Sequence, residues 1–417
     1  MTVFVLDKRK RPLMPCSNKR ARLLLERGRA VVHRFKPFTI RLKDRIQGDC
    51  VFQPIMLGID PGSKTTGLAL TRRDGEDAVL VFGVELQHRG LAIRAKLLRR
   101  SAYRRNRRSR KTRYRPARFK NRTKPKGWLP PSLRHRVEST LTWAGRFRRL
   151  APVTALAYEA VEFDTQRLRN PEVSGIQYQQ GTLQGYTVRA YVLQKWDYAC
   201  AYCGSKDRLT LDHVIPRSRH GSDAVTNLVC ACYGCNQRKG NRRVQEFLAK
   251  KPTVLKRVLE QLKKPLRDAS AVISTRPALH KALGEVGLPL TVGTGAETSY
   301  IRHRLKLPKS HVVDAACVAL TGTLKGEWFK PLLVVCAGTG RYQRVRTDRF
   351  GFPKAHRVRV KRPFGFQTGD LVRYGKVIGR TAVRMTGFFS FQHKHQNFNV
   401  KWSKLTLVQR SDGYLYC

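Results

Sequence analysis

Residues 209–216 read Leu-Thr-Leu-Asp212-His213-Val-Ile-Pro216, and the organisation of the chain can be worked out from this stretch. One Cys-x-x-Cys pair lies before it and a second lies after it. Four thiolates at these spacings suit one tetrahedral zinc ion, which replaces the hydrophobic core that so short a segment cannot build. The expected ligands are Cys200, Cys203, Cys232 and Cys235, and Cys230 is an alternative to Cys232.

A second set of ligands lies within the same forty residues. Asp212, His213 and Asn236 offer oxygen and imidazole groups, which suit a hard divalent cation and a general base. Thiolates do not hold magnesium, and carboxamides hold structural zinc poorly, so the two sets predict separate sites. One site would build the scaffold, and the other would carry out hydrolysis.

This pattern resembles the HNH nuclease family, in which Asp-His, Asn and Cys-x-x-Cys-Asn occur in this order. The resemblance implies a ββα-metal hairpin that hydrolyses one nucleic-acid strand with a single Mg²⁺. It also implies that His213 activates water, that Asp212 and Asn236 hold the cation, and that Asn227 orients the His213 ring. The alternative is a zinc ribbon without chemistry, which the intervening Asp-His and the two asparagines disfavour.

The composition of the chain limits the classes of partner that it can bind. Its 417 residues leave room for two to four domains, and 84 Lys and Arg against 28 Asp and Glu give a formal charge of +56. Such self-repulsion calls for an anionic partner, and nucleic acid is the common one. We see no apolar run of about 20 residues and no signal peptide, so we do not expect a membrane to be a partner of this chain. The cysteines beyond the zinc set are scattered, which favours a reducing, cytoplasmic compartment.

A second catalytic set is spread along the chain. Residues 55–60 predict a buried strand ending in Asp60, residues 66–71 and 78–86 predict two further strands, and residues 153–158 predict a strand followed by Glu159. The segment from His311 to Leu320 predicts a helix that carries His311 and Asp314 on one face. Three carboxylates converging from separate elements of a ribonuclease H-like sheet would hold two Mg²⁺ ions.

The order of these motifs resembles a RuvC nuclease split into three segments with an HNH module inserted. Together with the initial Arg11-Pro12-Leu13-Met14-Pro15, it resembles the IscB family of transposon-encoded, RNA-guided nucleases, which are relatives of the CRISPR type II effectors. The implied multidomain α/β fold runs as follows: PLMP domain 1–53, first RuvC segment 54–90, bridge helix 91–122, second RuvC segment 123–183, HNH 184–245, third RuvC segment 246–336, and a basic, SH3-like C-terminal β domain 337–417.

Residues 94–122 form the most basic segment and contain no acid. Arginines cover every face of a helix here, so no face is left to pack on a protein core, and phosphate must surround it. By resemblance this is the bridge helix, which contacts a structured guide (omega) RNA; Pro116 should end it. The expected RNA-contacting residues are Arg99, Arg100, Arg104, Arg105, Arg107, Arg108 and Arg110.

Taken together, the residues and the resemblance predict a monomeric ribonucleoprotein, nucleoid-associated in a prokaryotic cytoplasm, that cuts double-stranded target DNA. HNH would cut the guide-paired strand, and RuvC the displaced strand. The C-terminal domain would read a motif beside the target or only bind the RNA. Two other interpretations stay open: a protein-guided HNH/RuvC-like endonuclease without RNA, and an RNA-binding scaffold that does not cleave.

Overall fold

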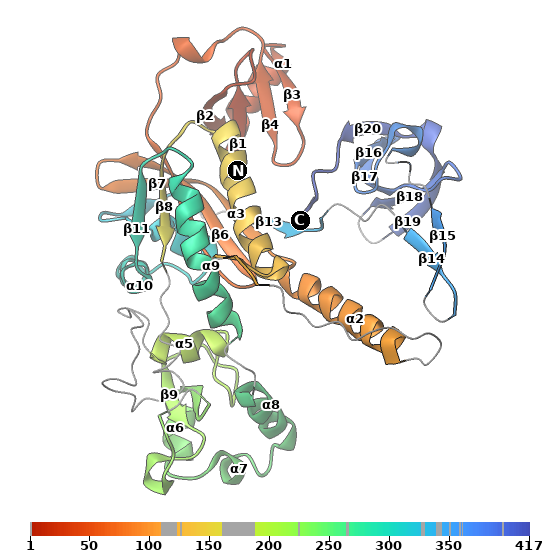
Figure 1. The fold of residues 1–417 in the computed structure, drawn as a ribbon. Helices are drawn as coiled ribbons and strands as arrows, with labels where there is room; N and C mark the ends of the chain where they lie inside the picture. Colours follow the sequence, from red (N-terminus) through yellow and green to blue (C-terminus); the bar gives the residue numbers. More distant parts are fainter. Residues whose placement is uncertain are drawn as a thin grey trace.

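The computed structural model describes residues 2–109, 123–125, 127–160, 188–223, 226–263, 267–326, 330–338, 344–349, 352–357, 360, 362–393 and 396–417. Arg110 and the expected helix end at Pro116 therefore lie outside the described residues. So do residues 171–184, which the sequence predicts as the connector into the HNH segment, and Arg341, Arg359 and Lys394, which it offers as candidates for reading the motif beside the target. The described portion is a mixed α/β protein of several units (Figure 1).

The N-terminal unit is a four-stranded sheet with the order β2-β1-β4-β3. Its strands are β1 (Thr2–Leu6), β2 (Pro12–Ser17), β3 (Ala30–Arg34) and β4 (Thr39–Leu42). Helix α1 (Asn18–Glu26) begins where the Ser17 hydroxyl accepts a hydrogen bond from the Arg20 backbone N–H. The sequence predicts strands at 3–6, 30–33 and 38–43 and a helix at 18–27 capped by Ser17, and these elements are confirmed. Strand β2, which contains Pro12 and Pro15, is an additional strand.

A large central sheet positions the candidate site. Its path is β11-β8-β5-β6-β7-β13-β21, with β12 (Leu324–Lys325) paired to β7. Strands β5 (Ile55–Asp60), β6 (Thr65–Asp74) and β7 (Asp77–Gln87) form an antiparallel meander, and β8 (Val153–Glu159) runs parallel to β5. The path is completed by β11 (Leu290–Gly293), β13 (Leu332–Cys336) and β21 (Tyr414–Tyr416). The four strands predicted around Asp60 and before Glu159 are confirmed.

Helices cover the two faces of this sheet differently. Helices α3 (Pro131–Leu150) and α9 (Arg267–Gly284) lie together on one face, where Trp143 and Phe147 pack with Leu57 in the main core. On the other face lies the short helix α11 (His311–Cys317), beside α10 (Gly295–Arg304). Gly293 and Gly295 predict a loop over residues 294–297, and this prediction is wrong. Thr294 and Glu297 form a capping box that starts α10.

Three glycines let α11 lie directly on the sheet. A Cβ at Gly58 would lie 1.8 Å from the Ala315 carbonyl oxygen, and one at Gly67 would lie 1.9 Å from that of His311. A Cβ at Gly83 would lie 2.5 Å from Val312 Cγ1. These three glycines lie on the neighbouring strands β5, β6 and β7, and we call them the glycine bed. Because they have no side chains, the helix can pack directly against the strand backbones. The close approach brings His311 and Asp314 down to the level of the strand ends.

The segment with the cysteine pairs folds into a separate small unit, which we call the zinc module. It contains α5 (Val188–Lys195), the hairpin β9 (Leu209–His213) and β10 (Leu228–Cys232), α6 (Tyr233–Lys239), α7 (Val244–Phe247) and α8 (Pro252–Lys263). Its core also includes Val258, Leu262 and Val272, so it extends past the expected boundary at 245.

Helix α9 joins the zinc module to the central sheet. Val272, near its start, packs in the core of the module, whereas Leu279 and Leu283 pack in the core of the central sheet. In Figure 1 the zinc module and the N-terminal unit lie at opposite ends of the sheet. The chain therefore returns from the module through a packed helix that contains Pro277.

The C-terminal segment forms a five-stranded antiparallel sheet with the order β19-β18-β17-β16-β20. The strands are β16 (Leu371–Tyr374), β17 (Val377–Ala382), β18 (Phe388–His393), β19 (Gln396–Lys401) and β20 (Thr406–Gln409); the hairpin β14 (Arg344–Thr347) and β15 (Pro353–Arg357) precedes them. Residues 411–413, Ser-Asp-Gly, predict the turn of a terminal hairpin. This prediction is wrong, because β20 pairs with β16 whereas β21 pairs with β13 of the central sheet.

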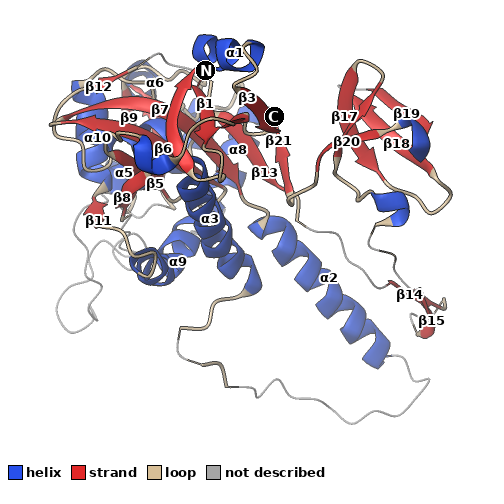
Figure 2. Ribbon diagram, turned by 90° about the horizontal axis from the view of Figure 1, so that it is seen from above, coloured by secondary structure: helices blue, strands red, loops and turns tan. Residues whose placement is uncertain are grey.

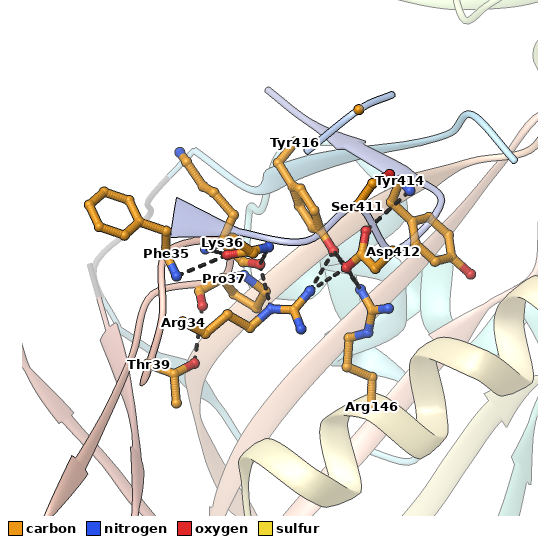
Figure 3. Close-up of polar contacts among 12 residues, drawn as sticks. Arg34, Phe35, Lys36, Pro37, Thr39, Arg146, Ser411, Asp412, Tyr414 and Tyr416 are labelled. Carbon is orange, nitrogen blue, oxygen red and sulfur yellow. Dashed lines mark hydrogen bonds and ion pairs between the residues drawn. The ribbon is translucent and has the colours of Figure 1, made fainter. Parts of the chain in front are cut away.

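Asp412 fixes this return of the chain (Figure 3). Its carboxylate pairs with Arg34 of β3 and lies 2.9 Å from Nη1 of Arg146 on α3, and it also accepts a hydrogen bond from the Tyr416 hydroxyl. The Arg146 guanidinium in turn makes cation–π contacts with the rings of Trp143 and Tyr414. One carboxylate thus joins the N-terminal unit, α3 and the C-terminal strand.

Candidate functional site

Predicted site residues from distant parts of the sequence meet at one end of the central sheet. Asp60 is the last residue of β5, and Glu159 is the last residue of the adjacent parallel strand β8. Helix α11 lies over them, and Nδ1 of His311 is 2.6 Å from Oδ2 of Asp60. Asp60, Glu159 and Asp314 are all buried. We call Asp60, Glu159, His311 and Asp314 the acid cluster; sequence positions up to 254 apart are thereby brought together.

The charges of the acid cluster act strongly on one another. Burial, followed by the nearby Asp60 and Asp314, raises the pKa of Glu159 to about 8. Burial and then Asp60 also raise the pKa of Asp314. Burial lowers the pKa of His311, but the Asp60 carboxylate outweighs burial and raises that pKa to about 9. Burial first, and repulsion between the carboxylates second, therefore oppose ionisation of Glu159 and Asp314.

Two cations of the chain approach Asp314. Lys309 pairs with Oδ2, and Nε of Arg302 lies 3.5 Å from Oδ1. Oδ1 is nevertheless buried without a hydrogen-bond donor among the described residues. A buried carboxylate oxygen without a donor, beside two other crowded carboxylates, is a suitable ligand set for a hard divalent cation such as Mg²⁺.

In the zinc module, His213 forms a pair with a carboxylate that the sequence did not indicate. Its Nε2 lies 2.7 Å from Oδ1 of Asp223, and Arg217 binds the same carboxylate through two hydrogen bonds of 2.8 Å. Arg217 and then His213 lower the pKa of Asp223, so this group is ionised at neutral pH. A carboxylate on one ring nitrogen fixes the orientation of the imidazole and leaves Nδ1 for a reacting proton.

Asp212 lies beside His213 on β9 but is buried and engaged. Its Oδ2 accepts a 2.5 Å hydrogen bond from the Tyr202 hydroxyl, and its Oδ1 is 3.0 Å from Nζ of Lys239. Nζ of Lys239, itself buried, also donates to the carbonyl of His213 at 2.6 Å. A cation at Asp212 would have to share these oxygens with Tyr202 and Lys239.

The two asparagines act on the backbone of the hairpin and its loop. Asn227 accepts a hydrogen bond from Ile215 N–H and donates to the carbonyls of Ile215 and Ser222. It therefore holds the loop that carries Asp223, and the expected direct orientation of the His213 ring falls to Asp223 instead. Asn236 donates to Oγ1 of Thr210 and to the carbonyl of Leu211, which leaves its amide oxygen facing away from those partners.

The four expected zinc ligands come together. The Sγ atoms of Cys200, Cys203, Cys232 and Cys235 all lie within 4.8 Å of one another. The backbone of Ser205 donates a hydrogen bond to Cys203 and is the main cause of its pKa falling to about 7, which favours the thiolate that zinc binds. The open choice between Cys230 and Cys232 is thereby answered in favour of Cys232. This four-cysteine cluster suggests a structural zinc.

A second group, His88, His135 and Cys336, also has its ligand atoms within 4.8 Å. Here both ring nitrogens of His88 already bind hydroxyl groups, those of Thr66 at 2.7 Å and Ser139 at 2.9 Å. Burial, then His135 and Arg136, lower the pKa of His88 to about 3, so a neutral ring is favoured beside cationic neighbours. The group therefore serves as a hydrogen-bonded joint at the start of the basic helix rather than as a dication site.

The basic helix is α2 (Gly90–Ser109), and it extends away from the central sheet in both views (Figure 1; Figure 2). Of the expected RNA-contacting arginines, Arg99, Arg104, Arg105 and Arg108 are exposed and Arg100 is half-buried. Arg107 lies on the helix with its side chain outside the described residues. Leu98 and Tyr103 are also exposed, so guanidinium groups and apolar side chains share the surface.

Several side chains of these sites escaped the sequence interpretation. Asp223, Lys309 and the glycines under α11 have no distinctive spacing. Lys309 lies two residues before His311, so nearness to a recognised motif was the available signal. The basic Lys239 belongs to the motif that resembles HNH nucleases, but its contact with Asp212 could not be read from the sequence. The glycines needed the sheet register before their shared face could be seen.

Comparison with known proteins adds to this geometry. The family model of the RRXRR protein matches residues 3–181, and the model of the HNH endonuclease matches residues 200–242. The second match covers the hairpin, the four cysteines, and both asparagines. The chain carries an HNH endonuclease domain. That domain implies nuclease activity and a divalent metal, as is typical of HNH nucleases.

A short part of the chain is also similar to a curated protein. The CRISPR-associated endonuclease Cas9 of Corynebacterium diphtheriae (strain ATCC 700971 / NCTC 13129 / Biotype gravis) is 43% identical over 53 residues, which are 12% of this chain and 5% of that protein. This chain therefore spans only a small fraction of its relative.

Among solved structures, Streptococcus thermophilus Cas9 in complex with the AGAA PAM shares 14% identity, with a TM-score of 0.20, over 45% of this chain and 26% of that one. The type II-C Cas9 from Actinomyces naeslundii shares 19% identity, with a TM-score of 0.16, over 48% and 29%. At these TM-scores the likeness defines no common arrangement. None of the described helices has the length and apolar character needed to cross a membrane.

Proposed function

We propose that this protein is an RNA-guided, Mg²⁺-dependent DNA endonuclease of the IscB type with two separate cutting sites. The observation that carries the proposal is the convergence of Asp60, Glu159, His311 and Asp314 at one end of the sheet, in a chain that also carries an HNH domain. The order of the central strands, β7-β6-β5-β8-β11 with β5 to β7 antiparallel, supports a ribonuclease H-like, split RuvC-type domain.

In the HNH site, His213 would take the proton of the attacking water at Nδ1 while Asp223 holds Nε2. Asn236 would present its amide oxygen, and Asp212 its carboxylate, to one Mg²⁺. Lys239 already touches Asp212 from the buried side and would keep its carboxylate in place. Asn227 would keep the loop of Asp223 in place.

In the acid cluster, Asp60, Glu159 and Asp314 would hold two Mg²⁺ ions. Bound there, the ions would stabilise negative charge on the attacking and leaving oxygens of the phosphodiester. His311, held by Asp60, would move a proton at the ring nitrogen that does not face Asp60. Burial of the carboxylates excludes water from the reacting oxygens and strengthens these electrostatic effects.

Guide RNA would lie along α2, whose exposed arginines suit bidentate contacts to phosphate. We propose the domain boundaries given above, with the zinc module extended to about residue 272 and β21 assigned to the central sheet. HNH would cut the strand paired to the guide, and the RuvC-type site would cut the displaced strand.

The test is to sequence the nucleic acid that copurifies with the full-length protein. We expect sequencing to give one abundant structured RNA with a variable end. Exchange of that end should redirect Mg²⁺-dependent cutting to a plasmid carrying the matching sequence. Sequence-specific cutting by protein that has been treated thoroughly with ribonuclease would instead establish the protein-guided alternative, and tight RNA binding without a cut product would establish the scaffold.

A further inference from the structure

Lys309 touches both the acid cluster and the zinc module. Its ammonium pairs with Oδ2 of Asp314 and lies 5.3 Å from the ring centroid of Tyr198. Tyr198 lies between α5 and Cys200, at the entry of the zinc module. The lysine side chain keeps 38% of its surface exposed, so it has room to leave.

The backbone at Tyr198 is in an unusual conformation. Asp197 and Tyr198 both have positive φ, at 50° and 53°, in a region that side chains other than glycine seldom occupy. Two consecutive residues of this kind store strain, which the surrounding structure must hold. Here the strained turn directs the Tyr198 ring at Lys309, where it attracts the ammonium through a cation–π contact.

The acid cluster is not closed around a site for a cation. The described groups whose ligand atoms all lie within 4.8 Å are the four cysteines and the group of His88. The carboxylates of Asp60, Glu159 and Asp314 are more widely spread, and the ammonium of Lys309 neutralises some of their charge. A divalent cation at Asp314 would be repelled by the ammonium of Lys309, which binds Oδ2 of the same carboxylate.

We propose that Lys309 is a built-in cation that competes with divalent metal for the acid cluster, and that Tyr198 of the zinc module holds it there. This inference rests on the proposed two-site function and adds a means of regulating it. When the zinc module moves, Lys309 loses the Tyr198 ring, and Asp314 becomes free for metal. By linkage, metal in the acid cluster must weaken the docking of the module by the same factor.

The test uses full-length protein carrying zinc and freed of other metals, with Mn²⁺ as the probe. Free Mn²⁺ is measured by electron paramagnetic resonance during a titration. An Asp212→Ala background reduces binding at the HNH site, and Asp60→Ala shows which binding belongs to the acid cluster. We expect Lys309→Gln to tighten this Asp60-dependent binding roughly tenfold, within the usual range of coupling between sites.

Matched variants separate the effect of the Lys309–Tyr198 contact from the effect of removing one positive charge from the protein. Tyr198→Ala should tighten Mn²⁺ binding in the same direction but less, whereas Tyr198→Phe, which keeps an aromatic face, should leave it unchanged. Lys306→Gln removes the same charge from an exposed site three residues away and should also have no effect. Thermal unfolding gives an independent reading, since Mn²⁺ should raise the Tm of Lys309→Gln more than that of the parent protein.

Each outcome decides a different point. Asp60-dependent binding that Lys309→Gln leaves unchanged or weakens would overturn this inference and leave the two-site function standing. Equal tightening by Lys306→Gln would also overturn it. Loss of all Asp60-dependent Mn²⁺ binding, in the parent and in Lys309→Gln, would overturn both the inference and the proposed RuvC-type site.

Discussion

The acid cluster and the proposed HNH site draw their residues from very different distances along the sequence. The hairpin and α6 place Asp212, His213 and Asn236 within twenty-five residues, on a unit whose small core is completed by four cysteines. The acid cluster takes its residues from two strand ends and a helix up to 254 positions apart, and it depends on the register of a large sheet. A local site can be recognised from spacing, whereas a distributed one depends on the fold.

The two sites should therefore fail for different reasons. Damage to the zinc ligands should remove the hairpin and spare the sheet. Damage to the glycine bed under α11 should displace His311 and Asp314 and spare the hairpin. The variants that follow use this contrast, and they run from the largest expected effect to the smallest.

Replacing two zinc ligands, Cys200→Ser with Cys203→Ser, should abolish HNH cutting. Binding of structural zinc supplies on the order of 10 kcal/mol to a module of this kind, so the hairpin should unfold. Metal analysis should show loss of one zinc per chain, while nicking by the acid cluster persists. Cys230→Ala is the control, because this buried residue lies outside the cluster and should keep the zinc. Retention of zinc by the double variant would contradict the assignment.

Gly58→Ala should reduce cutting by the acid cluster strongly while HNH cutting remains. The new methyl group would overlap the Ala315 carbonyl and lift α11, at a cost of roughly 1–3 kcal/mol in the free energy of unfolding. Gly145→Ala, in α3, is the matched control: nothing lies within 4 Å of its Cβ, and it should stabilise the protein by about 0.5–1 kcal/mol. Strand-specific gels and thermal unfolding measure both effects, and equal behaviour of the two variants would refute the tight approach of α11.

Sequence patterns predicted some elements of the fold and missed others for physical reasons. The strand ending in Asp60 and the His311–Asp314 face followed from periodicity, because buried strands and helical spacing leave local patterns. Helix α9, with Pro277 inside it, and α10, which begins at Gly295, did not follow, because Pro and Gly argue locally against helix and tertiary packing or a capping box outweighs them.

Sequence patterns also identified some residues of the two sites and missed others. Ligand types and spacing identified Cys200, Cys203, Cys232 and Cys235, and the structure brings them together. Spacing could not show that Asp223 would meet His213, since nine residues separate them and the path of this loop depends on hydrogen bonds from Asn227. Nor could it show that Lys309 would meet Tyr198, whose contact exists only once the zinc module is packed.

The stability of Mg²⁺-free protein should fall as pH rises from about 5 to about 8. Burial and neighbouring acids raise the pKa of Glu159 to about 8 from an ordinary 4.5, so between these values the folded state binds a proton that the unfolded state has lost. That contribution is complete below 4.5 and is lost as pH rises through 8. Glu159→Gln should flatten the dependence of Tm on pH, and added Mg²⁺ should restore stability at high pH; a parallel curve for the variant would refute the raised pKa.

Asp223→Ala should lower HNH cutting by roughly tenfold, since losing an orienting partner typically costs a functional histidine 10- to 100-fold. Single-turnover rates of the paired strand measure this, and cutting of the displaced strand is the internal control. Arg217→Gln removes the other partner of Asp223 but leaves the contact with His213, so its effect should be smaller. An unchanged rate for Asp223→Ala would show that the pair does not act in the reaction.

The most direct test of two independent sites is strand-resolved cleavage of an end-labelled target by guide-loaded protein carrying Asp60→Ala or His213→Ala. The account predicts that Asp60→Ala cuts only the guide-paired strand, that His213→Ala cuts only the displaced strand, and that the double variant cuts neither. Loss of both cuts from either single, correctly folded variant would contradict it.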